Sequence, residues 1–336
     1  MTLPTTRLGR TGLFVSRLAL GTMTFGLQTE EANAFAILDK AAAGGINFLD
    51  VADVYPLGGG LPLVGRTEEI VGRWLRAQGA NRRGDFIVAT KAGGPTGPNA
   101  WDRGVSRKHL LAAIDASLQR LQLDHVDLYQ IHHDDPHTPL DEAVEAMDLI
   151  VRSGRARYIG VSNFLAYRLA RALGRADVLR LTRFVSVQPR YSLLFREIER
   201  ELLPLVDEEG LGVLTYNPLA GGLLTGKYAP GSDPAANTRF TLGNAGAMYQ
   251  DRYWNERSFA AVQRLQQIAQ AAEVPLTTLA VAWVLANRSV SSVLLGASRP
   301  DQLDATLAAA AYVLPAELKQ QLDEATAEFR KGDAPR

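Results

Sequence analysis

Eight short apolar runs, rich in β-branched residues, recur along the chain, and each ends on a polar residue. A run without polar alternation is typical of a strand in a parallel sheet that is covered on both faces. Helical patterns separate the runs, so the alternation predicts an α/β fold, the (β/α)₈ TIM barrel, with an open doubly wound sheet as the alternative. The runs end at Thr22, Asp50, Lys91, His132, Asn163, Gln188, Asn217 and Ser298.

Several helix boundaries are marked by capping residues. Among the helical patterns, Ser106 is suited to cap the helix predicted over 106–121, and Pro139 to lie in the first turn of the helix predicted over 139–153. Two further helices are predicted over 30–43 and 198–209. Glycines follow several helices, where a left-handed residue is expected to end each one. These glycines are Gly44, Gly79, Gly154 and Gly210.

Additional segments surround the eight repeats. The segment 6–16, with Gly9 and Gly12, predicts a hairpin that plugs the barrel floor. A long glycine-rich loop, 220–254, and two helical patterns lie before the last strand, and a C-terminal helix is predicted after it. The helical patterns cover 256–273, 276–287 and 315–329. No linker interrupts the chain, so a single domain is expected over 1–330, followed by a polar tail, 331–336.

Composition excludes several classes of protein. The 36 basic and 36 acidic residues balance, so no positive field exists to attract nucleic acid or an anionic membrane. Cysteine is absent, which rules out disulfides and thiolate metal sites and fits a cytoplasmic protein. The N-terminus lacks the apolar core of a signal peptide, and the most apolar segment, 305–314, is too short to cross a bilayer. We therefore expect a soluble protein.

Four side chains suited to proton transfer fall at neighbouring strand ends. Active sites of (β/α)₈ barrels lie at the C-terminal ends of the strands, so Asp50, Lys91 and His132 are expected to meet, with Tyr55 just beyond. A tyrosine with a pKa of about 10 is a poor proton donor near neutrality. A neighbouring ammonium lowers that pKa, and a carboxylate holds the ammonium in place. Such a group can protonate an alkoxide as a cofactor delivers hydride to carbon.

The stretch "DLYQIHHDDPH", 127–137, raises the question of a metal site. Successive strand residues point to opposite sides, so His132 and His133 are not placed to share one ion. His132 is expected to face the mouth and His133 to support a neighbour. His137 and the aspartates suit a solvated turn, and no metal is predicted.

Three further features have competing interpretations. Lys91 taken alone would also suit a Schiff-base lysine, as in barrel aldolases. The loop 56–65 lacks the spacing of a phosphate-binding loop and is expected to rim the substrate pocket. Trp101 and Trp254 either line that pocket or pack against the barrel.

Seven ordered segments resemble the aldo-keto reductase family and together cover nearly the whole chain. They are "GINFLDVADVY", "VATK", "DLYQIHH", "IGVSNF", "VQPRYSLL", "YNPLAGGLLTGKY" and "LLGASRPDQL". The stretch 103–136 is most similar to the branch that contains potassium-channel β subunits and many bacterial reductases. The resemblance implies a catalytic tetrad of Asp50, Tyr55, Lys91 and His132, with Tyr55 as the general acid.

The resemblance also implies an NADPH that lies extended across the barrel mouth. NADPH is preferred to NADH because the guanidinium of Arg299 suits a 2′-phosphate. The family often carries an acid and an amide where this chain has Ala305 and Thr306, a departure that affects the expected adenine contacts. The implied cofactor contacts are Thr22, Met23, Asp50, Ser162, Asn163, Gln188, Tyr216, Asn217, Leu219, Gly221, Lys227, Arg239, Gly296, Ser298, Arg299 and Gln302.

These observations favour an NADPH-dependent oxidoreductase that reduces an aldehyde or ketone to an alcohol. Tyr55 and His132 would contact the carbonyl, and a keto-sugar, a small toxic aldehyde and a xenobiotic ketone all remain open as substrates. The alternative is a channel-β-subunit-like binding module whose cofactor acts as a sensor. Retention of His132 favours turnover, and the oligomeric state is left open.

Overall fold

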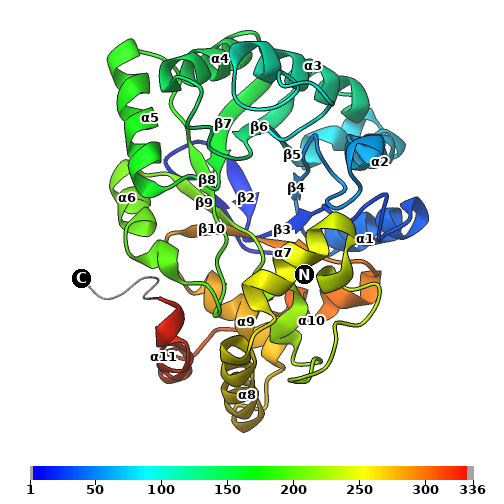
Figure 1. Cartoon of the computed structure of the whole chain (residues 1–336), viewed down its shortest axis with the longest axis vertical. Coiled ribbons are helices and arrows are strands. Elements are labelled where there is room, and N and C mark those ends of the chain that lie inside the picture. Colours follow the sequence, from blue (N-terminus) through cyan, green and yellow to red (C-terminus); the bar gives the residue numbers. More distant parts are fainter. Residues whose placement is uncertain (1–2, 331–336) are drawn as a thin grey trace.

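The computed structural model describes residues 3–330, and the predicted tail, 331–336, lies outside the described residues. Eight parallel strands close into a barrel in the order β10-β3-β4-β5-β6-β7-β8-β9, which confirms the predicted fold class and excludes the open sheet (Figure 1). The strands are β3 (Leu18–Gly21), β4 (Phe48–Asp50), β5 (Ile87–Ala92), β6 (Val126–Ile131), β7 (Ala156–Ser162), β8 (Ser186–Gln188), β9 (Gly212–Thr215) and β10 (Val290–Gly296).

Helices form a ring outside the barrel (Figure 1). No single described helix is both long and apolar enough to cross a membrane; only α8 and α9 together reach that length and composition, and they are bent by 96° at their junction. The helices are α1 (Glu31–Ala43), α2 (Arg66–Ala77), α3 (Arg107–Leu121), α4 (Leu140–Arg152), α5 (Ala166–Leu179), α6 (Leu202–Glu209), α7 (Gly246–Tyr253), α8 (Glu256–Ala271), α9 (Leu276–Leu285), α10 (Leu303–Ala308) and α11 (Ala316–Ala325).

The strands are mostly apolar because both of their faces are buried. In β5, Val88 belongs to the large core cluster between barrel and helices, whereas its neighbour Ala89 belongs to a smaller inner cluster. The side-chain alternation of a strand thus separates two apolar layers instead of an apolar layer and a wet one.

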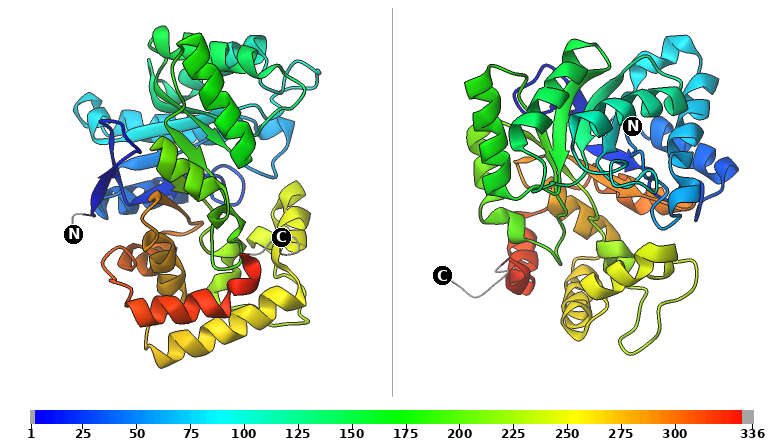
Figure 2. Two further views of the ribbon diagram at one scale, coloured as in Figure 1. Left: turned by 90° about the vertical axis from the view of Figure 1, so that its left-hand side faces the viewer. Right: turned by 45° about the horizontal axis from the view of Figure 1, so that its top comes forward.

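The predicted N-terminal hairpin closes one end of the barrel. It consists of β1 (Thr5–Arg7) and β2 (Phe14–Ser16), paired antiparallel. Leu8 and Val15 are fully buried in the inner cluster, so the hairpin completes the core from below. Gly9, with φ +58°, lies so close to Gly210 that an added Cβ would come within 2.5 Å of its carbonyl oxygen. The hairpin and α7 lie at opposite ends of the barrel (Figure 2).

Two local predictions are corrected by the structure. Gly44 was expected to be left-handed, but it is right-handed because its N–H still donates to the carbonyl of Lys40; the reversal comes one residue later, at Gly45, with φ +89°. Pro139 precedes α4 as its N-cap residue instead of lying in its first turn. The Ser106 cap is confirmed, since its hydroxyl accepts from the N–H of His109.

The glycine-rich segment before the last strand, predicted to be a long loop, contains a helix and several 3₁₀ turns. Residues 246–253 form α7, which the sequence did not predict. Short 3₁₀ turns precede it as η4 (Ala220–Thr225), η5 (Arg239–Thr241) and η6 (Gly243–Ala245). The other 3₁₀ turns are η1 (Leu61–Leu63), η2 (Ala80–Asp85), η3 (Glu197–Glu199), η7 (Pro300–Gln302) and η8 (Ala327–Phe329).

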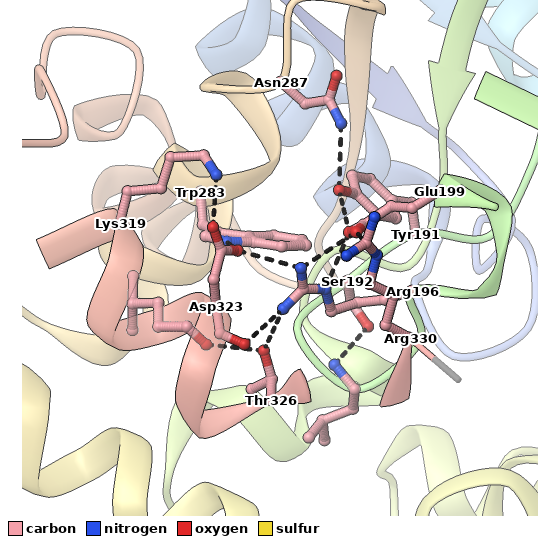
Figure 3. Close-up of polar contacts among 12 residues, drawn as sticks. Tyr191, Ser192, Arg196, Glu199, Trp283, Asn287, Lys319, Asp323, Thr326 and Arg330 are labelled. Atoms are coloured by element: carbon pink, nitrogen blue, oxygen red, sulfur yellow. Dashed lines mark hydrogen bonds and ion pairs between the residues drawn. The ribbon is translucent and has the colours of Figure 1, made fainter. Parts of the chain in front are cut away.

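A buried arginine attaches the C-terminal helix to the barrel (Figure 3). Arg196 is 5% exposed and forms ion pairs with Glu199 at 2.8 Å and with Asp323 of α11 at 3.2 Å. Its guanidinium also donates to the hydroxyl of Thr326 and lies over the ring of Trp283. The indole of Trp283 in turn donates to Asp323, so α11 is held by charge and by packing.

We expect Arg196→Met to lower the free energy of unfolding by about 3 kcal/mol, because breaking a buried ion pair from one side leaves its partners unpaired. The rate of amide hydrogen exchange in α11 should rise in the same variant. Arg257→Met is the matched control: its pair with Glu328 is exposed, so a change below about 1 kcal/mol is expected. Equal losses for the two variants in urea titrations would contradict the proposed attachment.

Candidate active site

Asp50 and Lys91, at the ends of β4 and β5, form a fully buried ion pair. The Lys91 ammonium donates to one Asp50 oxygen and, at 2.8 Å, to the carbonyl of Val51. The other Asp50 oxygen accepts from the side-chain amides of Gln188 at 2.8 Å and Gln130 at 3.3 Å. This network fixes the ammonium at the inner end of the mouth.

The ring of Tyr55 lies between Lys91 and His132. The Lys91 Nζ is 5.0 Å from the ring centroid, and the imidazole of His132 meets the ring edge to face at 5.7 Å between centroids. The structure therefore brings together all four residues of the expected tetrad. Tyr55 and His132 are each 8% exposed, so both sit just beneath the opening.

The electrostatics of Tyr55 differ from the sequence expectation. Burial raises its pKa well above the usual value, and the negative charge of Asp50 raises that pKa further. The attraction of the Lys91 ammonium for a phenolate does not outweigh burial and Asp50, because this ammonium lies over the ring face and is already paired with Asp50. The phenol is consequently protonated at neutral pH.

His132 is held as a neutral imidazole. Burial lowers its pKa well below the usual value, and the charges of Lys91 and His133 lower it further. Its Nδ1 is buried without a hydrogen-bond partner. Its backbone is fixed on both sides, since its N–H donates to Ala92 and its carbonyl accepts from the Asn163 side chain at 3.0 Å.

One expectation for the histidine-rich stretch is wrong: His133 does not point to the opposite side from His132, because both residues follow the end of β6 at Ile131. His133 stacks on the His132 ring at 4.6 Å with an interplanar angle of 8°, as a supporting neighbour at the exposed rim. Asp134 binds Arg168 through both oxygens, and Asp135 accepts from the hydroxyl of Thr138. Over residues 3–330, no group of three or more histidines or acids is arranged to hold a metal ion.

Strands β7, β8 and β9 contribute a second hydrogen-bonded group beside the tetrad. The hydroxyl of Ser162 donates to the carbonyl of Gln188 at 2.8 Å, and the hydroxyl of Tyr216 donates to the side chain of Asn163 at 2.8 Å. Asn163 adopts a left-handed backbone, with φ +58°. Thr22, just after β3 on the other side of the mouth, donates to the carbonyl of Asp50 at 2.8 Å.

The loop after β9 leads to the unpaired guanidinium of Arg239. The side chain of Asn217 accepts a hydrogen bond at 3.0 Å from the N–H of Gly221. Gly221 lies in the turn η4, and Leu219 immediately precedes that turn. An added Cβ at Gly296 would come within 3.6 Å of Arg239, and the Nη1 of that arginine is buried without a partner. An unsatisfied buried cation beside exposed glycine backbone fits a bound anion such as a phosphate.

The remaining predicted cofactor residues lie at the outer edge of the mouth. Arg299 is exposed and paired with Asp301 at 3.2 Å, and Gln302 accepts from the N–H of Ser298 at 2.8 Å. Lys227 is exposed beside the ring of Tyr228. Ala305 and Thr306 lie in α10, where the carbonyl of Ala305 accepts from Thr278 and the hydroxyl of Thr306 donates within its own helix.

The two tryptophans have different surroundings. Trp254 packs in an aromatic cluster with Tyr228, Phe240 and Phe259, and its indole donates to the carbonyl of Ser232. Trp101 is 56% exposed, with Lys108 over its ring.

The loop 56–65 lies against two neighbouring segments of the rim. The N–H of Leu57 donates to the carbonyl of Met23 at 3.0 Å. The carbonyl of Gly58 accepts from the N–H of Asn244, so this loop touches the turn before α7.

Comparison with known proteins assigns the chain to a family. The model of the aldo/keto reductase family matches residues 17–327. The chain belongs to the aldo/keto reductases. Three relatives of this aldo/keto reductase have different names and are 35–40% identical to it. It is 40% identical to the uncharacterized oxidoreductase YrpG of Bacillus subtilis, over 95% of this chain and 94% of that protein. It is 40% identical to a probable voltage-gated potassium channel subunit beta of Arabidopsis thaliana, over 90% and 89%, and 35% identical to L-glyceraldehyde 3-phosphate reductase of Escherichia coli O157:H7, over 88% and 84%.

Sequence reasoning missed two side chains behind the tetrad of this aldo/keto reductase. Gln130 lies two residues before His132 in the sequence. Strand alternation could therefore have placed its side chain on the same side of the chain as His132. Asp53 is fully buried and neither carboxyl oxygen has a side-chain partner. Burial and the charge of Glu68 raise the pKa of Asp53 well above its usual value, and no sequence motif signalled that.

The lowered pKa of His132 makes the stability of this aldo/keto reductase pH-dependent. The unfolded chain protonates this histidine near pH 6.5, whereas the folded protein resists protonation. The free energy of unfolding should therefore fall as the pH drops below about 6.5, by up to about 1.4 kcal/mol per pH unit for this group. His132→Gln should remove that part of the slope in urea titrations at several pH values. His137→Gln, at an exposed turn, should retain it, and identical slopes for both variants would refute the assignment.

Proposed function

We propose that the protein is an NADPH-dependent reductase that converts an aldehyde or ketone to an alcohol. The observation that carries the proposal is the buried, protonated phenol of Tyr55, with the neutral imidazole of His132 on one side and the Lys91–Asp50 pair on the other. A phenol in this setting holds a proton for a strongly basic oxygen and gives it up only when that oxygen develops negative charge.

Each member of the tetrad has a separate task in this proposal. His132 orients the carbonyl oxygen towards the hydroxyl of Tyr55, and that hydroxyl donates its proton to the oxygen. Lys91 lies over the ring and stabilises the phenolate that remains, while Asp50 holds the ammonium in place. Gln130 and Gln188 anchor Asp50 so that the carboxylate does not turn towards the substrate.

NADPH would supply the hydride that reaches the carbonyl carbon. Ser162, Asn163 and Gln188 would hold its carboxamide, and Tyr216 would stack on the nicotinamide ring. Arg239 would bind phosphate, as its unpaired Nη1 supports. The remaining contacts of this proposal are Thr22, Met23, Asp50, Asn217, Leu219, Gly221, Lys227, Gly296, Ser298, Arg299 and Gln302. Because Arg299 is exposed and its partner Asp301 is replaceable by a 2′-phosphate, we favour NADPH over NADH.

The similarity to probable potassium-channel β subunits supports a second candidate, a cofactor-binding module with little turnover. The similarity to L-glyceraldehyde 3-phosphate reductase supports the reductase and adds sugar aldehydes to the candidate substrates. One experiment separates the two. Oxidation of NADPH is followed at 340 nm with 4-nitrobenzaldehyde, and cofactor affinity is measured by fluorescence. Steady turnover supports the reductase, whereas tight NADPH binding without turnover of any aldehyde supports the module.

A further inference from the structure

The helix α7 lies at the edge of the barrel mouth, where the loop after β9 fixes it from one side (Figure 1). Its last residue, Tyr253, accepts a hydrogen bond at 3.2 Å from the side chain of Asn217, just after β9. Its buried Tyr249 packs against Gly221, where an added Cβ would be 3.1 Å from the ring. The Tyr249 face of α7 therefore points towards the proposed active site.

Arg252 shares this face, because residues three positions apart lie next to one another on a helix. The flanking position Asp251 is exposed, whereas Arg252 is only partly exposed. The charge of Arg252 acts on both His133, after β6, and Tyr216, after β9. Burial lowers the pKa of His133 and Arg252 adds to that lowering, whereas burial raises the pKa of Tyr216 and Arg252 partly offsets that rise. These strands are separated in the barrel by β7 and β8, so the guanidinium is within electrostatic range of two separate parts of the rim.

Arg252 has no ion-pair or hydrogen-bond partner among residues 3–330, whereas most other half-buried arginines, such as Arg17 and Arg183, contact a carbonyl or a carboxylate. The cations Lys91 and Arg190 also act on His133 and Tyr216 respectively, and the phenol of Tyr249 acts on Tyr216 in the opposite direction. A half-buried guanidinium that is paired with no carboxylate can bind an anion through two parallel hydrogen bonds.

We propose that Arg252 binds an anionic group of the substrate, a carboxylate or a phosphate, at the end opposite to the carbonyl, so that the protein prefers acidic carbonyl compounds. This inference rests on the proposed reductase function. The hydroxyl of Tyr55 and the imidazole of His132 fix one end of the substrate beneath the opening, and Arg252 fixes the other end above it. A neutral substrate makes only the first of these contacts.

The test compares two nearly isosteric aldehydes, 4-carboxybenzaldehyde and methyl 4-formylbenzoate, in NADPH-dependent reduction. A second pair, glyceraldehyde 3-phosphate and glyceraldehyde, distinguishes phosphate from carboxylate recognition. Arg252→Gln should lower kcat/KM for the acidic member of the preferred pair about 10- to 100-fold, mainly through KM, because a charge-assisted hydrogen bond is lost. It should change kcat/KM for the neutral member less than 3-fold. Arg252→Lys should restore part of the loss, and Arg171→Gln, at an exposed position of α5, should change neither rate.

The possible failures are distinguishable. Equal losses for acidic and neutral members, or a wild-type protein that does not prefer either acidic compound, would overturn the inference and leave the reductase in place. A weaker NADPH affinity of Arg252→Gln with an unchanged substrate preference would assign the guanidinium to the cofactor and would also overturn it. Turnover of none of the four aldehydes by the wild-type protein would refute the reductase itself, and the inference with it.

Discussion

Tyr55→Phe should lower kcat for carbonyl reduction by about 10²- to 10⁴-fold, the usual contribution of a positioned proton donor. The variant loses one oxygen atom and keeps the ring between Lys91 and His132, so its fold and its affinity for NADPH should change little. The measurement is the single-turnover rate with saturating cofactor and 4-nitrobenzaldehyde, which separates the chemical step from product release.

Tyr129→Phe is a matched control for this substitution. Tyr129 is also fully buried, and its hydroxyl donates to the carbonyl of Leu110 at 3.2 Å on the outer side of β6, away from the mouth. Its loss should cost about 1 kcal/mol of stability and leave kcat unchanged. A Tyr55→Phe variant that retains more than a tenth of the wild-type rate would show that another group supplies the proton.

Lys91→Met should have the largest effect on stability. It leaves the Asp50 carboxylate buried without its counter-charge, and breaking a buried ion pair from one side costs about 3–5 kcal/mol. The variant should also lose most of its activity, because the phenolate of Tyr55 would no longer be stabilised. Urea denaturation gives the first quantity and single-turnover kinetics the second.

The double variant Asp50→Asn/Lys91→Met separates these two effects. The asparagine is neutral, and its carbonyl oxygen still accepts from Gln188 and Gln130, so most of the lost stability should return. Activity should not return, since the ammonium remains absent. Recovery of both quantities would mean that Lys91 serves the fold and not the reaction.

The fold was predictable because each strand of the repeated β/α unit is a short run of apolar residues that can be recognised in the sequence alone. Each run of β-branched residues is buried on both faces, so the burial that stabilises a strand is visible within a few residues of sequence. The helix α7 escaped prediction because its sequence, "GAMYQDRY", has little apolar periodicity. Its contacts with Gly221 and Asn217 stabilise it instead, and these depend on the closed barrel.

The members of the candidate site were predictable in part for the same reason. Asp50, Lys91 and His132 end neighbouring strands, and the barrel geometry requires such residues to converge. The direction of the pKa shift at Tyr55 was not predictable, because it depends on how deeply the ring is buried and on which atoms Lys91 contacts. Arg252 was equally invisible, since nothing in its sequence neighbourhood shows which arginines remain unpaired after folding.

The contact between Arg196 and α11 joins two segments that are synthesised at different times. The ribosome makes Arg196 well before Asp323 and Thr326, so the nascent barrel carries a guanidinium that has met only its local carboxylate, Glu199. Asp323 and Thr326 must be synthesised before the Arg196 guanidinium has all of these partners. A chain that ends before Asp323 would leave the Arg196 guanidinium paired with Glu199 alone, and we expect such a chain to be cleaved faster by proteases.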